Sequence, residues 1–432
     1  MQKSITDSKW EELINKENIL SKLTNELVTI NAPLINRYRE CRLMTKFDHT
    51  SSLPNIFKKN KLNILPISRK QFLIGKFDVY SSLNTCYERP IYKEIPDNYV
   101  TLPTSPLEIT SEQTAIACAY ASGIIHDFTQ DDYPEHMIST ISGRMGSGKF
   151  SFFVDGTGVN NKHKVCVNGA QMELDAVFES PSAIYIIEAK NHECKDFILR
   201  QLYYPYKYLK GRNGQKKPII PIFMKYINGD YYLYKFRFAD DNCINSAECE
   251  SFKAYTIYPS NITSNDIDQL LTITSSNVEK SLIFPQADSF FRIEDMITAL
   301  REKGEPLSVE DIRDKNLDFT YRQADYYMHA AEYLGLVEII KDKNKKVKFT
   351  LKGRKIANLP YKEQKLAYAK SILESPIFSH AYRRYLANGC KISSPEIIDI
   401  INIYRSDLNN TTAKRRATTV SRWLEWITKL IN

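Results

Sequence analysis

Two acidic residues and a lysine occur at a spacing suited to binding a divalent cation and hydrolysing a phosphodiester. Asp175 lies in the segment MELDAVFES, and Glu188 and Lys190 end the segment IYIIEAK. Carboxylates on adjacent strands can form the hard oxygen cage that Mg²⁺ prefers. The ammonium beside them can orient or activate a water, or stabilise developing charge. This set of groups suits metal-assisted phosphodiester hydrolysis, in which the metal polarises the phosphate and generates the nucleophile.

The flanking sequence predicts two strands that position these groups. Within Gln171–Glu179, Glu173 and Asp175 share one face, while the other face is apolar. A short turn then leads to Ala183–Ala189, where four successive apolar or aromatic residues, IYII, indicate a buried central strand. A helix is expected over Lys195–Leu209, followed by further strands over Pro218–Tyr226 and Tyr231–Phe238.

Glu188 and Lys190 lie two residues apart, and therefore on the same face of the strand end. Burying such groups is costly unless they are paired or bind a metal. The alternative is a surface hairpin with an ordinary Glu–Lys ion pair. The buried run before them, the acidic face of the preceding strand and the helix after them favour the hydrolytic site.

A glycine-rich stretch, GRMGSGKF, differs in one residue from the P-loop signature G-x-x-x-x-G-K-[ST]. A P-loop needs a buried strand before the glycines and a helix directly after them, because the helix N-terminus holds the phosphates. Here Tyr133–Ile141 is expected to be helical or irregular, and Phe150–Asp155 has the composition of a strand. Phe150 also replaces the hydroxyl that binds Mg²⁺. We therefore expect no ATP binding.

The glycine stretch, Gly143–Gly148, is better interpreted as the turn leading into the first strand of the core. Its bare backbone and two cations can approach a DNA phosphate, which makes Arg144 and Lys149 candidate DNA contacts.

Asp175, Glu188 and Lys190 resemble the signature of the PD-(D/E)XK nucleases, an acidic residue on one strand and (D/E)-x-K on the next. The expected order of helix, three strands, helix and strand is also similar to the core of that family. Leu174 stands where the signature has proline, and Glu173 is a rival for the first acid.

The resemblance implies further site residues. The helix after the lysine flanks the active site in that family, which implies that Gln201 contacts a phosphate or a metal-bound water; a polar helix surface is the alternative. Some members carry an extra carboxylate from an upstream helix. Glu112, in the helix predicted over Ser111–Phe128, or Glu135 can fill this role, although each is otherwise a helix-surface acid.

Positive charge is concentrated at the C-terminal end. The chain has a net charge of +8, but residues 341–432 hold 20 Lys and Arg against 7 Asp and Glu, a net charge of +13. Such a segment is typical of a nucleic-acid-binding region, and a solvated lysine-rich surface is the alternative.

The segment from Pro306 to Pro360 resembles a winged helix, with Tyr321–Leu334 as the recognition helix and Lys341–Lys348 as the wing. The resemblance implies DNA contacts from the helix and the wing, namely Arg322, Gln323, Tyr326, His329, Lys345 and Lys346. Winged helices also serve as protein-interaction modules. The amphipathic helix Thr411–Leu430 adds cations placed as phosphate contacts, namely Lys414, Arg415, Arg416 and Arg422.

A metal nuclease core followed by a DNA-reading module resembles the type II restriction endonucleases. The resemblance implies an α/β (α+β) fold with a mixed sheet flanked by helices and a mainly helical C-terminal part. We expect a mixed α/β region over 1–105, the nuclease core over 106–285, a winged helix over 286–360 and a basic helical domain over 361–432. A second helix-turn-helix is an alternative interpretation of the region 361–432.

The resemblance implies a Mg²⁺-dependent, sequence-specific endonuclease acting on double-stranded DNA, with a cognate DNA methyltransferase encoded nearby. Whether the active form is a homodimer stays open. A repair, junction-resolving or modification-dependent nuclease is the alternative, and a DNA-binding regulator with an inactive nuclease fold is a further one. No stretch reaches the ~20 apolar residues of a membrane span. The start, MQKSITDSKWEELINKEN, also lacks an apolar signal-peptide region, so we expect a cytoplasmic protein. The eight cysteines form no C-x-x-C pair, which favours reduced thiols over a zinc module or a disulfide framework.

Overall fold

The structure is a computed structural model that describes residues 4–23, 27–83, 90–96, 99, 101–103, 109–157, 161–213, 216–227, 229–257, 262–273, 279–303, 306–309, 311, 321–340 and 345–431. The chain forms two compact units, one of residues 1–102 and 110–257 and the other of residues 103–109 and 258–432. Both units combine helices with strands, so the expected mixed class, with a mixed sheet and C-terminal helices, is confirmed.

The first unit begins with four helices around a small sheet. The helices are α1 (Ile5–Lys16), α2 (Ala32–Asn36), α3 (Cys41–Thr45) and α4 (Asn55–Asn60), and the antiparallel strands are β1 (Leu27–Asn31), β3 (Gln71–Gly75) and β2 (Asn63–Pro66), in that order. They share a hydrophobic core that includes Trp10, Leu13 and Phe57. The Trp10 indole donates a hydrogen bond to the carbonyl of Met44 (2.7 Å), which fixes α3 against α1.

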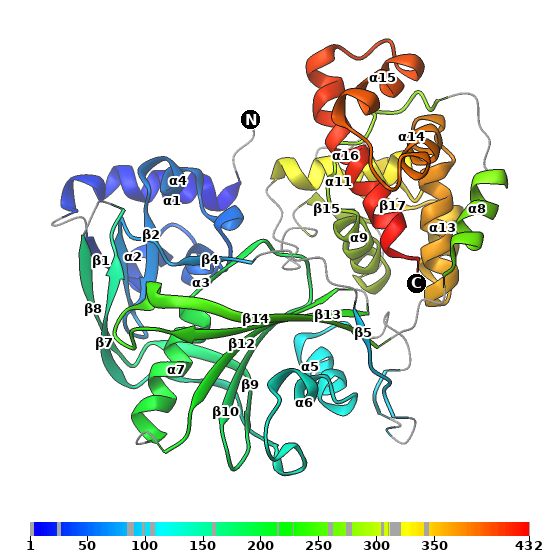
Figure 1. The fold of residues 1–432 in the computed structure, drawn as a ribbon. Coiled ribbons are helices and arrows are strands. Elements are labelled where there is room, and N and C mark those ends of the chain that lie inside the picture. Colours follow the sequence, from blue (N-terminus) through cyan, green and yellow to red (C-terminus); the bar gives the residue numbers. More distant parts are fainter. Residues whose placement is uncertain are drawn as a thin grey trace. The chain divides into compact units, whose positions relative to one another are not determined.

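A seven-stranded mixed sheet is the largest element of this unit (Figure 1). Its strands, in spatial order, are β5 (Ile91–Tyr92), β14 (Ala247–Thr256), β13 (Asp230–Phe238), β12 (Ile219–Ile227), β10 (Ile184–Lys190), β9 (Gln171–Glu179) and β6 (Ile138–Gly146). β10 runs parallel to β12 and antiparallel to β9. Every residue of β10 is buried, as expected for a central strand.

Helices cover both faces of this sheet. α7 (Arg200–Asn213) packs on one face and connects β10 to β12, while α5 (Glu112–Ala121) and α6 (Ile124–Thr129) pack on the other (Figure 1). The helix predicted over Lys195–Leu209 begins later than expected, because Asp196–Ile198 forms a short strand, β11, that pairs with β4 (Tyr80–Ser82).

The glycine stretch is not followed by a helix, in agreement with the prediction that it is no P-loop. Two other expectations for it are wrong. Ile138–Gly146 forms strand β6 of the large sheet, so Gly143 and Gly146 lie within this strand and do not form a turn leading into it. Lys149–Asp155 forms β7, which pairs with β8 (Lys162–Asn168) in a separate two-stranded sheet. Because β6 is a mostly exposed edge strand, its sequence lacks the apolar pattern that signals a strand.

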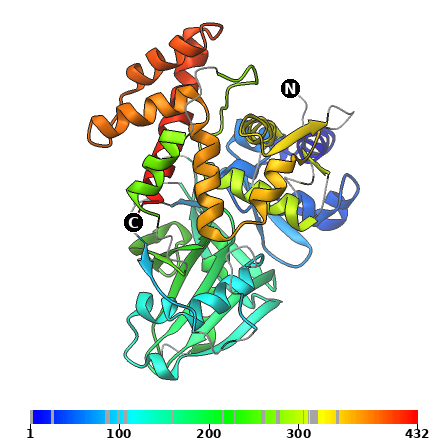
Figure 2. The same ribbon diagram turned by 90° about the vertical axis from the view of Figure 1, so that its right-hand side faces the viewer.

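The second unit is mainly helical. Its elements are α8 (Ser264–Ile273), α9 (Phe290–Lys303), β15 (Leu307–Ser308), α11 (Tyr321–Tyr333), β16 (Val337–Ile340), β17 (Lys346–Phe349), α12 (Leu351–Ala357), α13 (Tyr361–Leu373), α14 (Pro376–Ala387), α15 (Ser394–Tyr404) and α16 (Asn410–Lys429). The three strands form an antiparallel sheet in the order β15-β17-β16. Figure 2 shows these helices, coloured yellow-green to red, from a second direction.

One hydrophobic core joins the small sheet of the second unit to its C-terminal helices. The predicted anchoring of the last helix is confirmed, because Trp423, Trp426 and Ile427 are buried. The Trp423 ring meets Phe290 edge to face at 5.4 Å, and its indole nitrogen donates to the carbonyl of Ala287 (2.7 Å). The C-terminal helices therefore pack directly on α9.

Candidate active site

The register of β9 and β10 brings the two predicted metal-binding carboxylates together. Ile187 lies opposite Ala176, and one further step places Glu188 opposite Asp175 on the same face of the sheet. At that step the backbone ladder ends, and the Ala189 N–H donates instead to Asp175 Oδ2 (2.8 Å). The Asp175 side chain thus occupies the place of a main-chain acceptor between the two strands.

Glu188 and Lys190 form a buried ion pair at the end of β10. The Lys190 ammonium donates to Glu188 Oε1 at 2.5 Å, and the two side chains are only 6% and 7% exposed. Gln201, from the first turn of α7, donates through Nε2 to the same oxygen at 2.5 Å. The other side-chain atom of this amide, Gln201 Oε1, is buried without a hydrogen-bond partner.

The start of α5 adds a third carboxylate. Glu112 Oε1 lies 3.7 Å from Lys190 Nζ, and the neighbouring Gln113 side chain donates to the main-chain carbonyl of Asp175 (2.9 Å). Of the two upstream acids considered from the sequence, the structure brings Glu112 to the cluster. Glu135 is exposed and pairs with His136 at 3.5 Å.

A fourth carboxylate, Asp48, comes from the N-terminal region and was missed by sequence reasoning. Its side chain is 13% exposed, and Arg200 Nη2 lies 3.6 Å from its Oδ1. The local sequence KFDHT contains no motif that marks this aspartate. Its position depends on packing between segments about 150 residues apart, which local patterns do not report.

Burial and mutual repulsion perturb the acids of this cluster. Burial raises the pKa of Asp175 and Glu112, and raises the pKa of Glu188 well above its ordinary value. Burial alone would lower the pKa of Lys190, but the carboxylates around it, with Glu188 the strongest, outweigh that effect and raise it. Asp48 is also buried, yet Lys190 and Arg200 lower its pKa.

The charge of the cluster fits a divalent cation. Four carboxylates (Asp48, Glu112, Asp175 and Glu188) face three cations, Lys190, Arg200 and Lys46, whose Nζ lies 3.8 Å from Asp48 Oδ2, so the acids outnumber the cations and the formal charge is negative. Among the described residues, no three His, Cys, Asp or Glu side chains converge closely enough to form a metal site by themselves. Since Mg²⁺ keeps several waters and takes one or two carboxylates from the protein, Asp175 and Glu188 suffice as ligands.

Glu173 lies outside the buried cluster. Its side chain is 60% exposed and its Oε1 lies 3.3 Å from Arg144 Nε. The structure therefore separates the two rivals for the first acid, with Asp175 inside the site and Glu173 on the surface. Lys149 is exposed at the start of β7.

The exposed side of α11 carries both signs of charge. Arg322 Nε donates to the Tyr326 hydroxyl (2.5 Å), and Gln323 is half-buried. His329 lies between Asp325 (3.8 Å) and Glu332 (3.2 Å).

Lys345 pairs with Asp325 at 2.5 Å, while Lys346 starts β17 and is half-buried. The first four residues of the predicted wing, 341–344, lie outside the described residues.

The four predicted phosphate contacts of α16 have different environments. Lys414 and Arg415 are exposed. Arg416 Nη1 donates to Gln286 Oε1 (2.9 Å), and its Nε is buried without a hydrogen-bond partner. Arg422 pairs with Glu425 on its own helix at 3.0 Å. Arg416 is therefore an anchoring residue of the helix as well as a cation.

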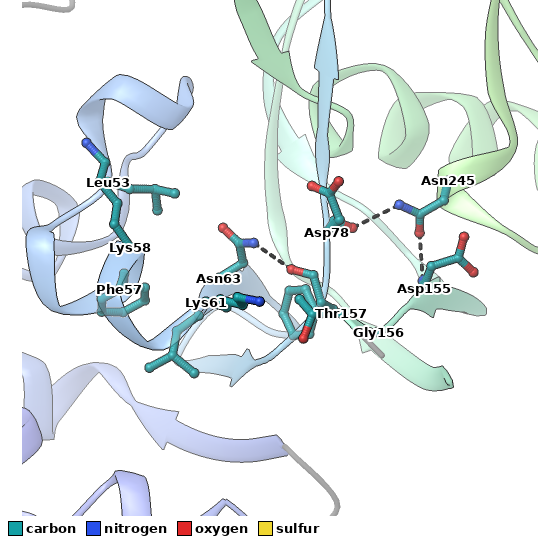
Figure 3. A pocket seen from close by; sticks show the side chains of 12 residues that line it. Leu53, Phe57, Lys58, Lys61, Asn63, Asp78, Asp155, Gly156, Thr157 and Asn245 are labelled. Atoms are coloured by element: carbon teal, nitrogen blue, oxygen red, sulfur yellow. Dashed lines mark hydrogen bonds between the residues drawn. The ribbon is translucent and has the colours of Figure 1, made fainter. Parts of the chain in front are cut away.

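A cavity of about 430 Å³ lies elsewhere in the first unit, and none of the four clustered acids lines it. It opens between α4 and the end of β7, with Lys58, Lys61, Asp78, Asp155 and Asn245 among its lining residues (Figure 3). Asn245 bridges its two acidic residues, because it donates to the Asp78 carbonyl (3.0 Å) and accepts from the Asp155 N–H (2.8 Å). The cavity contains no arrangement for phosphodiester chemistry comparable with the cluster.

In a comparison with known protein families, three family models each match a different part of the chain. They are Domain of unknown function (DUF6996) over residues 7–74, Domain of unknown function (DUF6997) over residues 75–256 and Domain of unknown function (DUF7226) over residues 292–432. No curated protein and no solved structure matches. The four acids span two of these regions, since Asp48 lies in the first and the other three in the second. In the described part of the chain, no helix is long and apolar enough to cross a membrane.

Proposed function

We propose that the protein is a Mg²⁺-dependent endonuclease of the PD-(D/E)XK type that cleaves double-stranded DNA at specific sequences, as type II restriction enzymes do. One observation carries the proposal. Asp175 and Glu188 lie opposite each other on adjacent strands, and Lys190 follows on the same face, in a largely buried cluster whose carboxylates outnumber its cations. A protein has little structural reason to bury such a surplus, whereas a metal nuclease needs it.

The order of elements around the site supports the same family. In chain order α5, β6, β9, β10, α7 and β12 give a helix, three strands, a helix and a strand. The helix α6 follows α5, the β7–β8 hairpin is inserted after β6, and the short strand β11 lies between β10 and α7. In this assignment Asp175 and Glu188 bind Mg²⁺, which would polarise the scissile phosphate and activate a water. Lys190 places a positive charge beside the reacting groups, and Gln201 holds the Glu188 carboxylate in position.

The second unit supplies a DNA-reading module in this proposal. α9, β15, α11, β16 and β17 follow one another in the order of a winged helix, with α11 as the recognition helix. Arg322 and Tyr326 are its base-reading candidates. The internal ion pairs of His329 and Lys345 make these two weaker candidates than the sequence suggested.

Digestion of unmethylated phage DNA tests the proposed function. With Mg²⁺ the wild-type protein is expected to produce discrete fragments, and with EDTA none. A smear of products would retain the nuclease assignment and reject sequence specificity. Cleavage confined to branched or modified DNA would favour a junction-resolving, repair or modification-dependent enzyme. Absence of cleavage on all of these substrates would contradict the proposal.

The exposed cations of α16 lead to a prediction about DNA affinity. Replacing Lys414 and Arg415 by alanine should weaken binding to all sequences alike and reduce the slope of log affinity against log salt by about 2, because each phosphate contact releases close to one counterion. Fluorescence anisotropy at several salt concentrations measures both. Lys370→Ala, at an exposed position of α13, controls for lost charge. An unchanged salt slope in the double variant would exclude these residues from the DNA interface.

A further inference from the structure

Two cations beside the candidate active site have no role in the proposed reaction so far. Arg200 Nη2 lies 3.6 Å from Asp48 Oδ1, and Lys46 Nζ lies 3.8 Å from Asp48 Oδ2. Both distances exceed those of hydrogen bonds, and Asp48 Oδ1 is buried without a hydrogen-bond partner. The three side chains therefore form a loose triad, in which two positive charges and one negative charge leave a formal charge of +1.

The Arg200 guanidinium has donors available for a ligand. Its side chain is only 19% exposed, yet no described residue accepts a hydrogen bond from it, and Asp48 is its one ion-pair partner among them. Guanidinium carries several N–H donors in a fixed fork, and donors that are largely buried are nearly always hydrogen-bonded. The fork fits two oxygens of a phosphate group. Arg200 is therefore suited to bind an anionic group that the described chain does not supply.

Both cations lie close to the acids of the site. Arg200 begins α7, and the next residue, Gln201, donates to Glu188 Oε1 at 2.5 Å. Lys46 is 47% exposed, so its ammonium is open to solvent. Burial raises the pKa of Asp175, and the charge of Lys46 counteracts part of that rise. The triad therefore borders the cluster of acids, with one cation partly buried and the other at the surface.

The backbone that carries Asp48 is fixed to the element before α7. The Ile198 N–H donates to the Asp48 carbonyl (2.9 Å), and the Thr50 N–H donates to the Asp196 carboxylate (2.9 Å). Asp196 and Ile198 belong to β11, which runs directly into α7. The same short strand therefore sets the backbone positions of Asp48 and Arg200.

We propose that Arg200 and Lys46 bind a backbone phosphate of the DNA beside the metal site, and that Asp48 holds both cations in place. A DNA phosphate carries one negative charge, which matches the formal charge of the triad. The acids of the site repel DNA, and cations next to them offset that repulsion. The region of residues 7–74 then contributes to substrate binding. This inference rests on the proposed function.

The salt dependence of DNA binding is the first test. Fluorescence anisotropy is measured for wild type, Lys46→Met and Arg200→Met in Ca²⁺, which takes oxygen ligands as Mg²⁺ does. Each substitution should weaken binding about 3- to 10-fold and reduce the slope of log affinity against log salt by about 1, because one phosphate contact is lost. Lys59→Met, at an exposed position of α4, is the matched control and should leave the slope unchanged.

Lys46→Met keeps this test decisive even if Arg200→Met is unstable, because Lys46 is half exposed and its loss leaves Arg200 beside Asp48. A wild-type slope in Lys46→Met, or in a folded Arg200→Met, would overturn the inference. Absence of DNA binding by wild type would do the same.

Neutral methylphosphonates then locate the contact on the DNA. Once digestion has identified a cut site, the phosphates around the cut are replaced singly and kcat/KM is measured. At the contacted phosphate, replacement should lower kcat/KM of wild type about tenfold and have little further effect on Lys46→Met and Arg200→Met, because their contact is already weakened. If the losses were independent at every position tested, the inference would be overturned. Should wild type cleave no DNA at all, the proposed function fails, and the salt slopes still decide whether the two cations bind phosphate.

Discussion

Replacing Asp175 by asparagine is expected to reduce Mg²⁺-dependent DNA cleavage by at least about 10³-fold, which corresponds to about 4 kcal/mol of transition-state stabilisation. Asparagine keeps the shape of the side chain and can still accept the hydrogen bond from the Ala189 N–H. It removes the charge that the metal requires. Cleavage of supercoiled plasmid, followed over time on gels, measures the loss.

The fold of this variant should be intact. Burial raises the pKa of Asp175, so its ionised form is less favourable in the folded protein than in the unfolded chain, and neutral asparagine avoids that cost at pH 7. The melting temperature in EDTA is therefore expected to equal or exceed that of wild type.

Glu173→Gln is the matched control, since Glu173 lies two positions away on the same strand but is 60% exposed. It should retain cleavage within about threefold of wild type, because surface substitutions away from the site have small effects. If Glu173→Gln were inactive and Asp175→Asn active, the metal would have to be bound at the surface side of β9.

Replacing Gly353 by alanine should strongly destabilise the second unit. A Cβ at this position would overlap the main-chain carbonyl of Leu336, with the carbonyl carbon only 2.6 Å away. Neither group can move easily, because the Gly353 N–H donates to the Thr350 hydroxyl (2.8 Å) and the Thr350 N–H donates to the Leu336 carbonyl (3.1 Å). We expect a loss of about 3 kcal/mol, the upper end for overpacking, seen as a fall of roughly 5–10 °C in calorimetric melting.

Gly211→Ala provides the contrast for that measurement. Gly211 lies in α7 with open space where its Cβ would be, so alanine should add helix propensity, about 0.5–1 kcal/mol of stability, and produce no clash. Equal melting temperatures for Gly353→Ala and wild type would show that α12 does not approach β16 as closely as described.

The sequence was most informative where function depends on local pattern. The alternation in β9 and the apolar run in β10 predicted both strands, and the two-residue spacing of Glu188 and Lys190 predicted that they share a face. The strand that was expected after the glycine stretch, in place of the helix of a P-loop, is confirmed, because β7 begins at Lys149.

Such local patterns did not predict the features that depend on packing between distant segments. β6 was not predicted, since an exposed edge strand of small and polar residues has no apolar periodicity. Asp48 was missed because the hydrogen bonds that place it join residues near 48 to residues near 197. The pairing of Lys345 with Asp325 was also not predictable, because it depends on where the α11 surface meets the chain at the start of β17. The partners of His329, by contrast, lie three and four residues away on α11 itself.

The most direct test of the buried carboxylate–lysine cluster as a catalytic site is a paired plasmid assay of wild type and Glu188→Gln, purified in parallel and matched for melting behaviour. The account predicts that wild type linearises or nicks the DNA with Mg²⁺ and not with EDTA, and that Glu188→Gln does neither while still binding DNA. Equal Mg²⁺-dependent cleavage by the two proteins would contradict it, because Glu188 could then be neither a metal ligand nor the partner of a catalytic Lys190.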